Sequence, residues 1–167
     1  GGFISPPGPG YPAWGPERDW NVQWDIRAME KVINTEVALT LVPITTTIRA
    51  FIREADLPRI EATGPLGELI ARQSRLWADD HDYARIGQEH PAFPDDLANF
   101  HHDPLTVAVA LGWPGVTLEQ QRQMPYVEND IMSFEPSDAG REIDVCTGVD
   151  AAALNEAMLD ALDRAQQ

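Results

Sequence analysis

Hydrophobic residues along the chain recur at helical spacing in some segments and form short continuous runs in others. After Asp25, which is placed to cap a helix, they recur at Ile26, Met29, Val32 and Ile33. The run "VALTLVPI", residues 37–44, then predicts a short buried strand rich in β-branched residues. Residues 45–47 are threonines that predict the cap of another helix through "IRAFI". A helix followed by a buried strand is typical of an α/β fold.

The middle of the chain combines one clear helix with a long polar segment. After Gly64 and Pro65, residues 66–77 carry hydrophobic side chains on one face and predict an amphipathic helix. The segment "ADDHDYARIGQEHPAFPDDLANF", residues 78–100, contains two prolines and predicts a loop with one helical turn. Long loops on rigid scaffolds often cover sites, so we expect this one near functional residues.

The last third predicts a helix, two strands and a final helix. "TLEQQRQ", residues 117–123, opens with Thr117 and Gln120 at capping-box spacing and predicts a helix. "MPYVEND" and "REIDVCTGV" predict antiparallel strands around the turn "EPSDAG". Asp150 then predicts the cap of a last helix with Leu154, Met158, Leu159 and Leu162 on its hydrophobic face. No internal repeat and no second domain are evident.

The stretch "NFHHDPLTVAVALGW", residues 99–113, is dense in polar side chains before a hydrophobic helix. Asp103 followed by Pro104 predicts a helix start with Asp103 as N-cap, and Gly112 lies just past the predicted end. One oxygen of a capping carboxylate can still bind a cation. His101 and His102 are adjacent, so we expect their side chains to diverge. Either is a candidate general acid beside a carboxylate, or a structural histidine.

A second polar patch is "RDWNVQWD", residues 18–25. Asp19, Trp20 and Asn21 place an acid and an amide around an indole. Such a set is able to hydrogen-bond a polyol against an apolar wall, as in sugar pockets. The alternative is a loop in which Asp19 or Asn21 only closes a turn.

Composition excludes several classes of protein. The 167 residues, 43% hydrophobic and 23% charged, fit one globular domain. The net charge of −15 argues against nucleic-acid binding, which needs clustered Lys and Arg. No run approaches the roughly 20 apolar residues of a membrane span, and we expect a cytoplasmic protein. Cys146 is the single cysteine, and we expect it to be a buried structural thiol. The chain carries no HExxH or CxxC motif of a zinc site and no GxSxG motif of a serine nucleophile.

Taken in order, "DWNVQWDIRAMEKV", "ALTLVPITTT", "HHDPLTVAVAL", "GREIDV" and "VDAAALNEAMLDAL" resemble the C-terminal half of the calcium-dependent, inosine-uridine-preferring nucleoside hydrolases. The resemblance covers nearly the whole chain. It implies an α/β fold: the C-terminal part of an open, mostly parallel sheet flanked by helices, with a small β-hairpin. It also implies N-ribohydrolase activity, cleaving purine or pyrimidine nucleosides to base and ribose.

The resemblance implies roles for individual residues. Asp103 corresponds to a Ca²⁺ ligand, and His102, rather than His101, corresponds to the residue that protonates the leaving base. Asp19 and Asn21 correspond to residues that hydrogen-bond the ribose hydroxyls, with Trp20 between them. Calcium suits such a site because it accepts carboxylates, water and a diol in a flexible oxygen shell.

The chain also departs from the family pattern. It lacks the DxDxGxDD-like cluster that supplies the base and the remaining calcium ligands, Asp19 stands where the family has Glu, and "GPGYPAWG" replaces a sugar-contacting Gly-Asn. We therefore expect residues 1–167 to be the C-terminal portion of a nucleoside-hydrolase-like domain that begins inside a larger protein. The N-terminal half would come from another chain or segment. The alternatives are a non-catalytic binding or regulatory subunit and an unrelated α/β protein.

Overall fold

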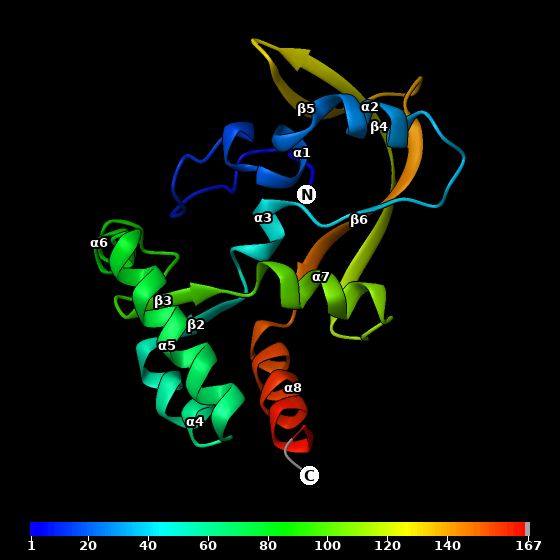
Figure 1. Ribbon diagram of the computed structural model, residues 1–167. Coiled ribbons are helices and arrows are strands. Elements are labelled where there is room, and N and C mark those ends of the chain that lie inside the picture. The colour runs from blue at the N-terminus through cyan, green and yellow to red at the C-terminus, as the bar shows by residue number, and fades with distance from the viewer. Residues whose placement is uncertain (166–167) are drawn as a thin grey trace.

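Two sheets organise the computed structural model, which describes residues 1–165 (Figure 1). The larger sheet has the order β1-β6-β4-β5, and the smaller one pairs β2 with β3. The strands are β1 (Thr40–Leu41), β2 (Phe51–Arg53), β3 (Leu97–Phe100), β4 (Val116–Glu128), β5 (Ile131–Pro136) and β6 (Arg141–Val149). The α/β class predicted from the sequence is confirmed. The larger sheet is mixed, since only the β1–β6 pair is parallel where a mostly parallel sheet was expected, and a small antiparallel sheet lies beside it.

Strand direction changes across the larger sheet. β1 runs parallel to β6, with Thr40 opposite Asp144, whereas β4 is antiparallel to both β6 and β5. The predicted strand at residues 141–149 is β6, but it does not pair with residues 124–130. Those residues lie mostly in the distal part of β4 and pair with β5. The turn at residues 135–140 thus joins two strands that flank β4 on opposite sides.

Residues 117–123 form part of β4, so the predicted helix there is wrong. Their strand pairs with β6 from Val116 opposite Val149 to Gln123 opposite Arg141. A capping-box spacing contributes only local hydrogen bonds at a helix start. The ladder hydrogen bonds that this strand forms with β6 override the local signal.

The helices are α1 (Trp20–Trp24), α2 (Ile26–Ile33), α3 (Ile44–Thr47), α4 (Leu57–Glu61), α5 (Pro65–Asp80), α6 (Tyr83–Glu89), α7 (His102–Ala110) and α8 (Ala151–Arg164), with 3-10 turns η1 (Pro16–Arg18) and η2 (Glu54–Asp56). Two predicted caps are confirmed. The Asp25 carboxylate accepts from Ala28 N at 2.8 Å, and the Asp150 carboxylate accepts from Ala153 N at 3.0 Å. The predicted helix at residues 66–77 is α5.

Three boundaries differ from the sequence-based expectation. The buried run at residues 37–44 keeps only two strand residues, and α3 begins at Ile44. Residues 48–52 do not continue a helix, because Phe51 and Ile52 pair with β3. The polar segment at residues 78–100 holds the end of α5, then α6 and β3, where a loop was predicted.

Hydrophobic cores lie on both sides of β6 and beneath the helices. Ile143 and Val145 pack with Leu41, Met132 and Phe134, whereas Cys146 packs on the opposite side with Leu105 and Leu154. A third cluster joins α4, α5, β3 and α8, and an aromatic cluster surrounds Tyr83 and Phe100. Cys146 is fully buried, as expected of a structural thiol.

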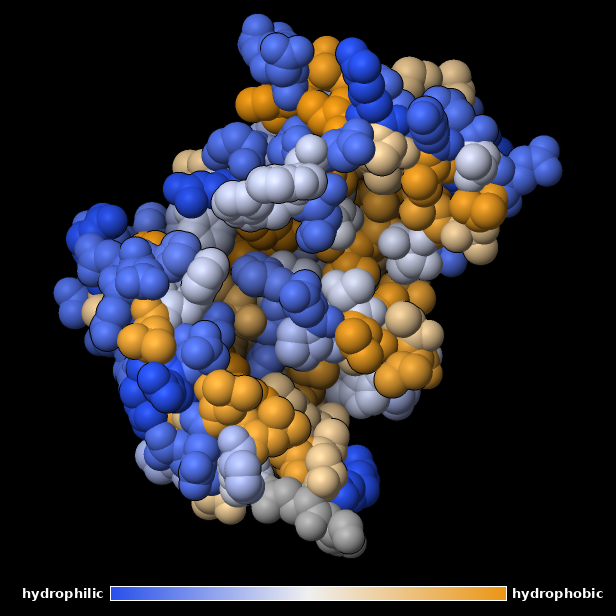
Figure 2. All heavy atoms as spheres, in the orientation of Figure 1, coloured by the Kyte–Doolittle hydropathy of each residue, from blue (hydrophilic) through white to orange (hydrophobic). Residues whose placement is uncertain are grey.

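None of the helices within residues 1–165 is long and apolar enough to cross a membrane. The chain begins near α1 and α3, and α8 extends away from the larger sheet (Figure 1). Over α8 the surface is partly hydrophobic where this helix faces α4 and α5 (Figure 2). This arrangement leaves one cavity beside β1 and another between α4 and α8.

Candidate functional site

The cavity beside β1 has a volume of about 300 Å³ and is lined by Gly1 and by residues from three other segments. All five residues assigned to a site from the sequence line it: Asp19, Trp20, Asn21, His102 and Asp103. Arg18, Val42, Ile44, Thr47 and Thr106 also contribute to its wall. The structure therefore brings the two polar patches of the sequence together, although about 80 residues separate them along the chain.

The location of this cavity follows from the direction of β1. Val42, Ile44 and Thr47 come directly after the carboxyl end of β1, in the connection to α3 and in α3 itself. In α/β sheets ligands bind at the carboxyl ends of the strands, where the chain leaves the sheet. The first turns of α1 and α7 meet at this same edge.

Asp19 is buried and acts as the N-cap of α1. Its Oδ1 accepts from Val22 N at 3.4 Å, and its Oδ2 accepts from Gly2 N. Only 4% of the residue is exposed. Both oxygens thus already have backbone partners, and a ribose hydroxyl has to share or displace one of them.

Trp20 and Asn21 follow Asp19 in the first turn of α1 and are exposed. The Trp20 indole is 71% exposed and stacks on Trp24, with ring centroids 5.7 Å apart. The Asn21 amide and the Trp20 ring thus stand at the cavity beside the buried Asp19. An apolar plate next to an amide matches the expectation for a sugar or nucleoside pocket.

The start of α7 corrects one prediction. The N-cap is His101, so Asp103 occupies the second helical position and does not cap the helix. His101 N donates to Ala50 O at 2.8 Å, and this bond to the neighbouring segment keeps His101 in a non-helical conformation. The exposed Asp103 carboxylate remains in the first turn, where the helix dipole favours a negative charge.

His102 lies against Thr47 from α3. Its Nδ1 is 2.6 Å from Thr47 Oγ1. The same hydroxyl also lies 3.3 Å from the backbone oxygen of Ile44. Burial lowers the pKa of His102 from 6.5 to about 4, although the nearby Asp103 carboxylate opposes this shift. At neutral pH the ring is therefore an uncharged hydrogen-bond donor.

His101 points elsewhere, as the divergence of adjacent side chains predicted. It is 1% exposed and its Nε2 lies 2.7 Å from Asn155 Oδ1 in α8. Burial lowers its pKa, and the bond to Asn155 opposes this. It lines the other cavity, between α4 and α8. His102, and not His101, therefore shares a cavity with Asp103.

Within residues 1–165 no group of three or more His, Cys, Asp or Glu side chains is placed to hold a metal ion. Asp103 is the one exposed carboxylate that lines the cavity beside β1. The described residues therefore do not form a calcium shell by themselves, and calcium binding stays a prediction that requires further ligands.

Thr47 is a polar lining residue in contact with His102 that the sequence analysis did not predict. It lies in the "ITTT" stretch, which was read only as the start of a helix. A usable signal exists, because these threonines come directly after a predicted buried strand. Polar residues at that point of an α/β fold are candidates for a ligand site.

Comparison with known proteins gives a structural match. No family model matches the chain, and no curated protein sequence matches it. Among solved structures, a plant nucleoside hydrolase, the PpNRh1 enzyme, superposes with a TM-score of 0.66 at 16% sequence identity. The match covers 86% of this chain. The chain has the fold of part of a nucleoside hydrolase.

The same comparison shows how much of that fold is present. The chain spans 46% of the length of the plant enzyme, so about half of the larger protein has no counterpart here. The similarity in fold agrees with the resemblance seen in the sequence motifs. It does not extend to the roles of the five predicted site residues, which stay predictions.

Proposed function

We propose that this chain is the C-terminal portion of a ribonucleoside hydrolase of the calcium-dependent, inosine-uridine-preferring kind, completed by an N-terminal half from another chain or segment. The single observation that carries the proposal is the meeting of two polar patches, residues 19–21 and 102–103, in one cavity at the carboxyl end of β1. The fold shared with the plant nucleoside hydrolase supports it.

Each residue has a task that its position permits. Asn21 and Asp19 hydrogen-bond the ribose hydroxyls, with Trp20 as the apolar wall beside them. In its protonated form His102 would donate the Nε2 proton to the nitrogen of the departing base and return to neutral imidazole, while Nδ1 lies against Thr47; the low pKa makes this form scarce at neutral pH. Asp103 supplies one carboxylate to a calcium ion whose other ligands, together with the catalytic base, come from the N-terminal half. Alone, the chain binds ligand weakly and does not hydrolyse it.

A second candidate is a non-catalytic nucleoside-hydrolase-like binding or regulatory subunit. Asp19 favours it, because both of its carboxylate oxygens accept backbone hydrogen bonds and it is shorter than the Glu of the resembled family. A residue committed to capping α1 contributes less to holding a diol. This candidate keeps the ribose pocket and loses the chemistry.

Ligand binding to the chain tests the pocket, which both candidates require. Isothermal titration calorimetry with inosine, 2′-deoxyinosine and hypoxanthine is expected to give the tightest binding for inosine. Only inosine carries both the 2′- and the 3′-hydroxyl of ribose. Asn21→Ala should weaken the binding of inosine at least fivefold. Asn34→Ala, a substitution at the exposed C-cap of α2, should leave the affinity unchanged. Equal affinity for the three compounds would refute a ribose pocket here.

Hydrolysis by the completed protein separates the two candidates. Asp103→Ala is expected to abolish inosine hydrolysis in the assembly with the N-terminal half, because it removes a metal ligand. His102→Ala should slow the hydrolysis of inosine far more than the hydrolysis of a riboside whose leaving group is p-nitrophenolate, because this leaving group needs no protonation. Inosine binding without any hydrolysis would establish the non-catalytic subunit. Full activity of Asp103→Ala would exclude the assigned role of this residue.

A further inference from the structure

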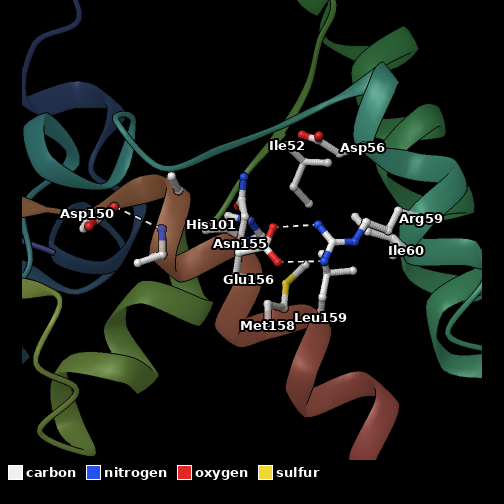
Figure 3. Close-up of a pocket in the computed structure, with 12 residues that line it drawn as sticks. Ile52, Asp56, Arg59, Ile60, His101, Asp150, Asn155, Glu156, Met158 and Leu159 are labelled. Carbon is white, nitrogen blue, oxygen red and sulfur yellow. Dashed lines mark hydrogen bonds and ion pairs between the residues drawn. The ribbon is translucent and has the colours of Figure 1, made fainter.

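The second cavity lies between α4 and α8 and is separate from the nucleoside pocket. Its volume is about 370 Å³. Hydrophobic side chains from both sides line it: Ile52 and Ile60 on one side, Met158 and Leu159 on the other. Figure 3 shows these side chains converging on a common space from α8 and from the segment of β2 to α4.

A salt bridge spans this cavity. Arg59 in α4 donates from both terminal nitrogens to the two carboxylate oxygens of Glu156 in α8, at 2.6 and 2.7 Å (Figure 3). The two side chains are 61% and 58% exposed. An exposed pair of this kind contributes little to stability, so a ligand is able to rearrange it.

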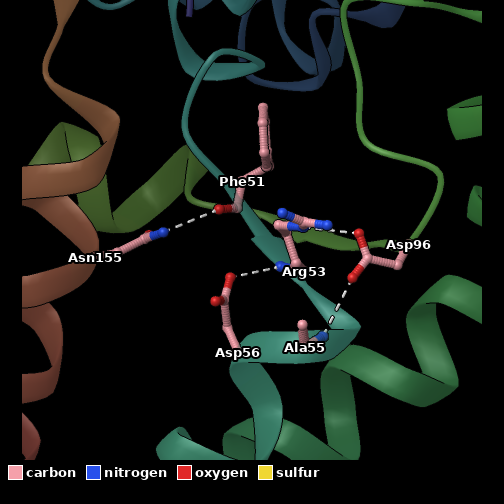
Figure 4. A network of polar contacts seen from close by, with 6 residues as sticks. All are labelled: Phe51, Arg53, Ala55, Asp56, Asp96 and Asn155. Carbon is pink, nitrogen blue, oxygen red and sulfur yellow. Dashed lines mark hydrogen bonds and ion pairs between the residues drawn. The ribbon is translucent and has the colours of Figure 1, made fainter.

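The inner wall carries a polar pair, the buried His101 and the partly buried Asn155. His101 is 1% exposed, and its Nε2 lies 2.7 Å from Asn155 Oδ1. Asn155 also connects this pair to β2, because its Nδ2 donates to Phe51 O at 3.4 Å (Figure 4). Because the Asn155 amide donates to Phe51, its oxygen faces His101, and His101 carries its proton on Nε2. His101 Nδ1 is then an acceptor that makes no hydrogen bond to any residue within 1–165.

Unused acceptors outnumber donors around the cavity. Asp56 accepts from Arg53 N through Oδ2 only, and Asp150 accepts from Ala153 N through Oδ1 only, so each keeps one free oxygen. Figure 4 shows the Asp56 carboxylate turned toward the Arg53 backbone. The lining holds three carboxylates and one guanidinium, in a chain of net charge −15.

We infer that this cavity binds a small organic cation, an amidinium or ammonium group carried on an apolar body. The body fits between Ile60 and Met158, and the charged head donates to the free oxygen of Asp56. A neutral ligand gains no charge attraction from Asp56 and Asp150, and an anion is repelled by them. The inference is independent of the proposed nucleoside chemistry. His101 lines this cavity and the adjacent His102 lines the nucleoside pocket, so the two cavities lie on opposite sides of the start of α7.

Three probes of one shape and different charge test the inference: benzamidinium, benzamide and benzoate, titrated into the full chain by calorimetry and by methyl NMR. Benzamidinium is expected to bind at least tenfold more tightly than benzamide, with no saturable binding of benzoate. The methyl signals of Ile52 and Met158 should shift with benzamidinium. Absence of benzamidinium binding, or equal binding of all three probes, overturns the inference.

Variants locate the bound cation. Asp56→Asn keeps the acceptor for Arg53 N and removes the charge, so it should weaken benzamidinium at least fivefold. Asp138→Asn makes the same charge change in the exposed turn between β5 and β6 and should leave the affinity within twofold. Met158→Trp should abolish binding by filling the cavity. The inference is also overturned if Asp56→Asn and Asp138→Asn bind benzamidinium with equal affinity. Methyl shifts that leave out Ile52 and Met158 overturn it as well.

Discussion

Replacing Asn155 with Leu tests whether this amide is the acceptor that holds His101. Leu has nearly the same shape as Asn but accepts no hydrogen bond, so the substitution removes the 2.7 Å bond to His101 Nε2. His101 is 1% exposed, and its Nε2–H would be left without a partner next to an apolar side chain. An unsatisfied buried donor costs about 1–3 kcal/mol, and we expect Asn155→Leu to lower the free energy of unfolding by about 2 kcal/mol.

Asn155→Ala gives the diagnostic comparison. The smaller side chain leaves room for water from the adjacent cavity, which then accepts from His101, so we expect a loss of only about 1 kcal/mol. Helix propensity separates Ala from Leu by only a few tenths of a kcal/mol, so it does not account for this difference. The expected order of stability is wild type, Asn155→Ala, then Asn155→Leu.

Urea unfolding followed by tryptophan fluorescence and circular dichroism measures these differences. Asp163→Leu, at an exposed position of the same helix, controls for the effect of placing Leu in α8 and should change stability by less than about 0.5 kcal/mol. Equal slopes with denaturant concentration are needed for a direct comparison. The reasoning is refuted when Asn155→Leu is as stable as wild type, or more stable than Asn155→Ala.

Three further outcomes follow from the structure. Because burial lowers the pKa of His102 to about 4, the folded chain binds this proton less readily than the unfolded chain, whose pKa is 6.5, and stability falls as pH drops from 6.5 toward 4. At pH 5.5 the part of the loss due to His102 is about 1.4 kcal/mol, so His102→Gln should lose that much less than wild type, and the remaining loss comes from His101, whose pKa is also lowered by burial. Urea titrations at pH 7.5 and 5.5 will show the difference, and an equal loss in both proteins contradicts it. Gly67→Ala should destabilise by about 2 kcal/mol despite the better helix propensity of Ala, since a Cβ there meets Ile60 O; a rise in melting temperature contradicts the close packing of α4 on α5. Asp150→Ala should cost about 1 kcal/mol through the lost cap of α8, and no change in urea midpoint would argue against that cap.

Local signals in the sequence determined the parts of the fold that depend on neighbouring residues. The caps Asp25 and Asp150 and the hydrophobic spacing of α2, α5 and α8 are properties of a few consecutive residues, so they were readable without the fold. The five candidate site residues were also named from the sequence, because acids, amides and imidazoles cluster in two short patches. Their roles were predicted from the resemblance of both patches, taken in order, to nucleoside hydrolase motifs.

Only the tertiary structure decided what depends on partners distant in the chain. Residues 117–123 are a strand because β6 supplies their ladder partners, and α7 begins at His102 because Ala50 O accepts a hydrogen bond from His101 N. Thr47 contacts His102 across 55 positions of sequence, and Asn155 reaches His101 across 54. A hydrogen bond formed across such a separation leaves no local pattern, since each partner is an ordinary polar residue in its own segment.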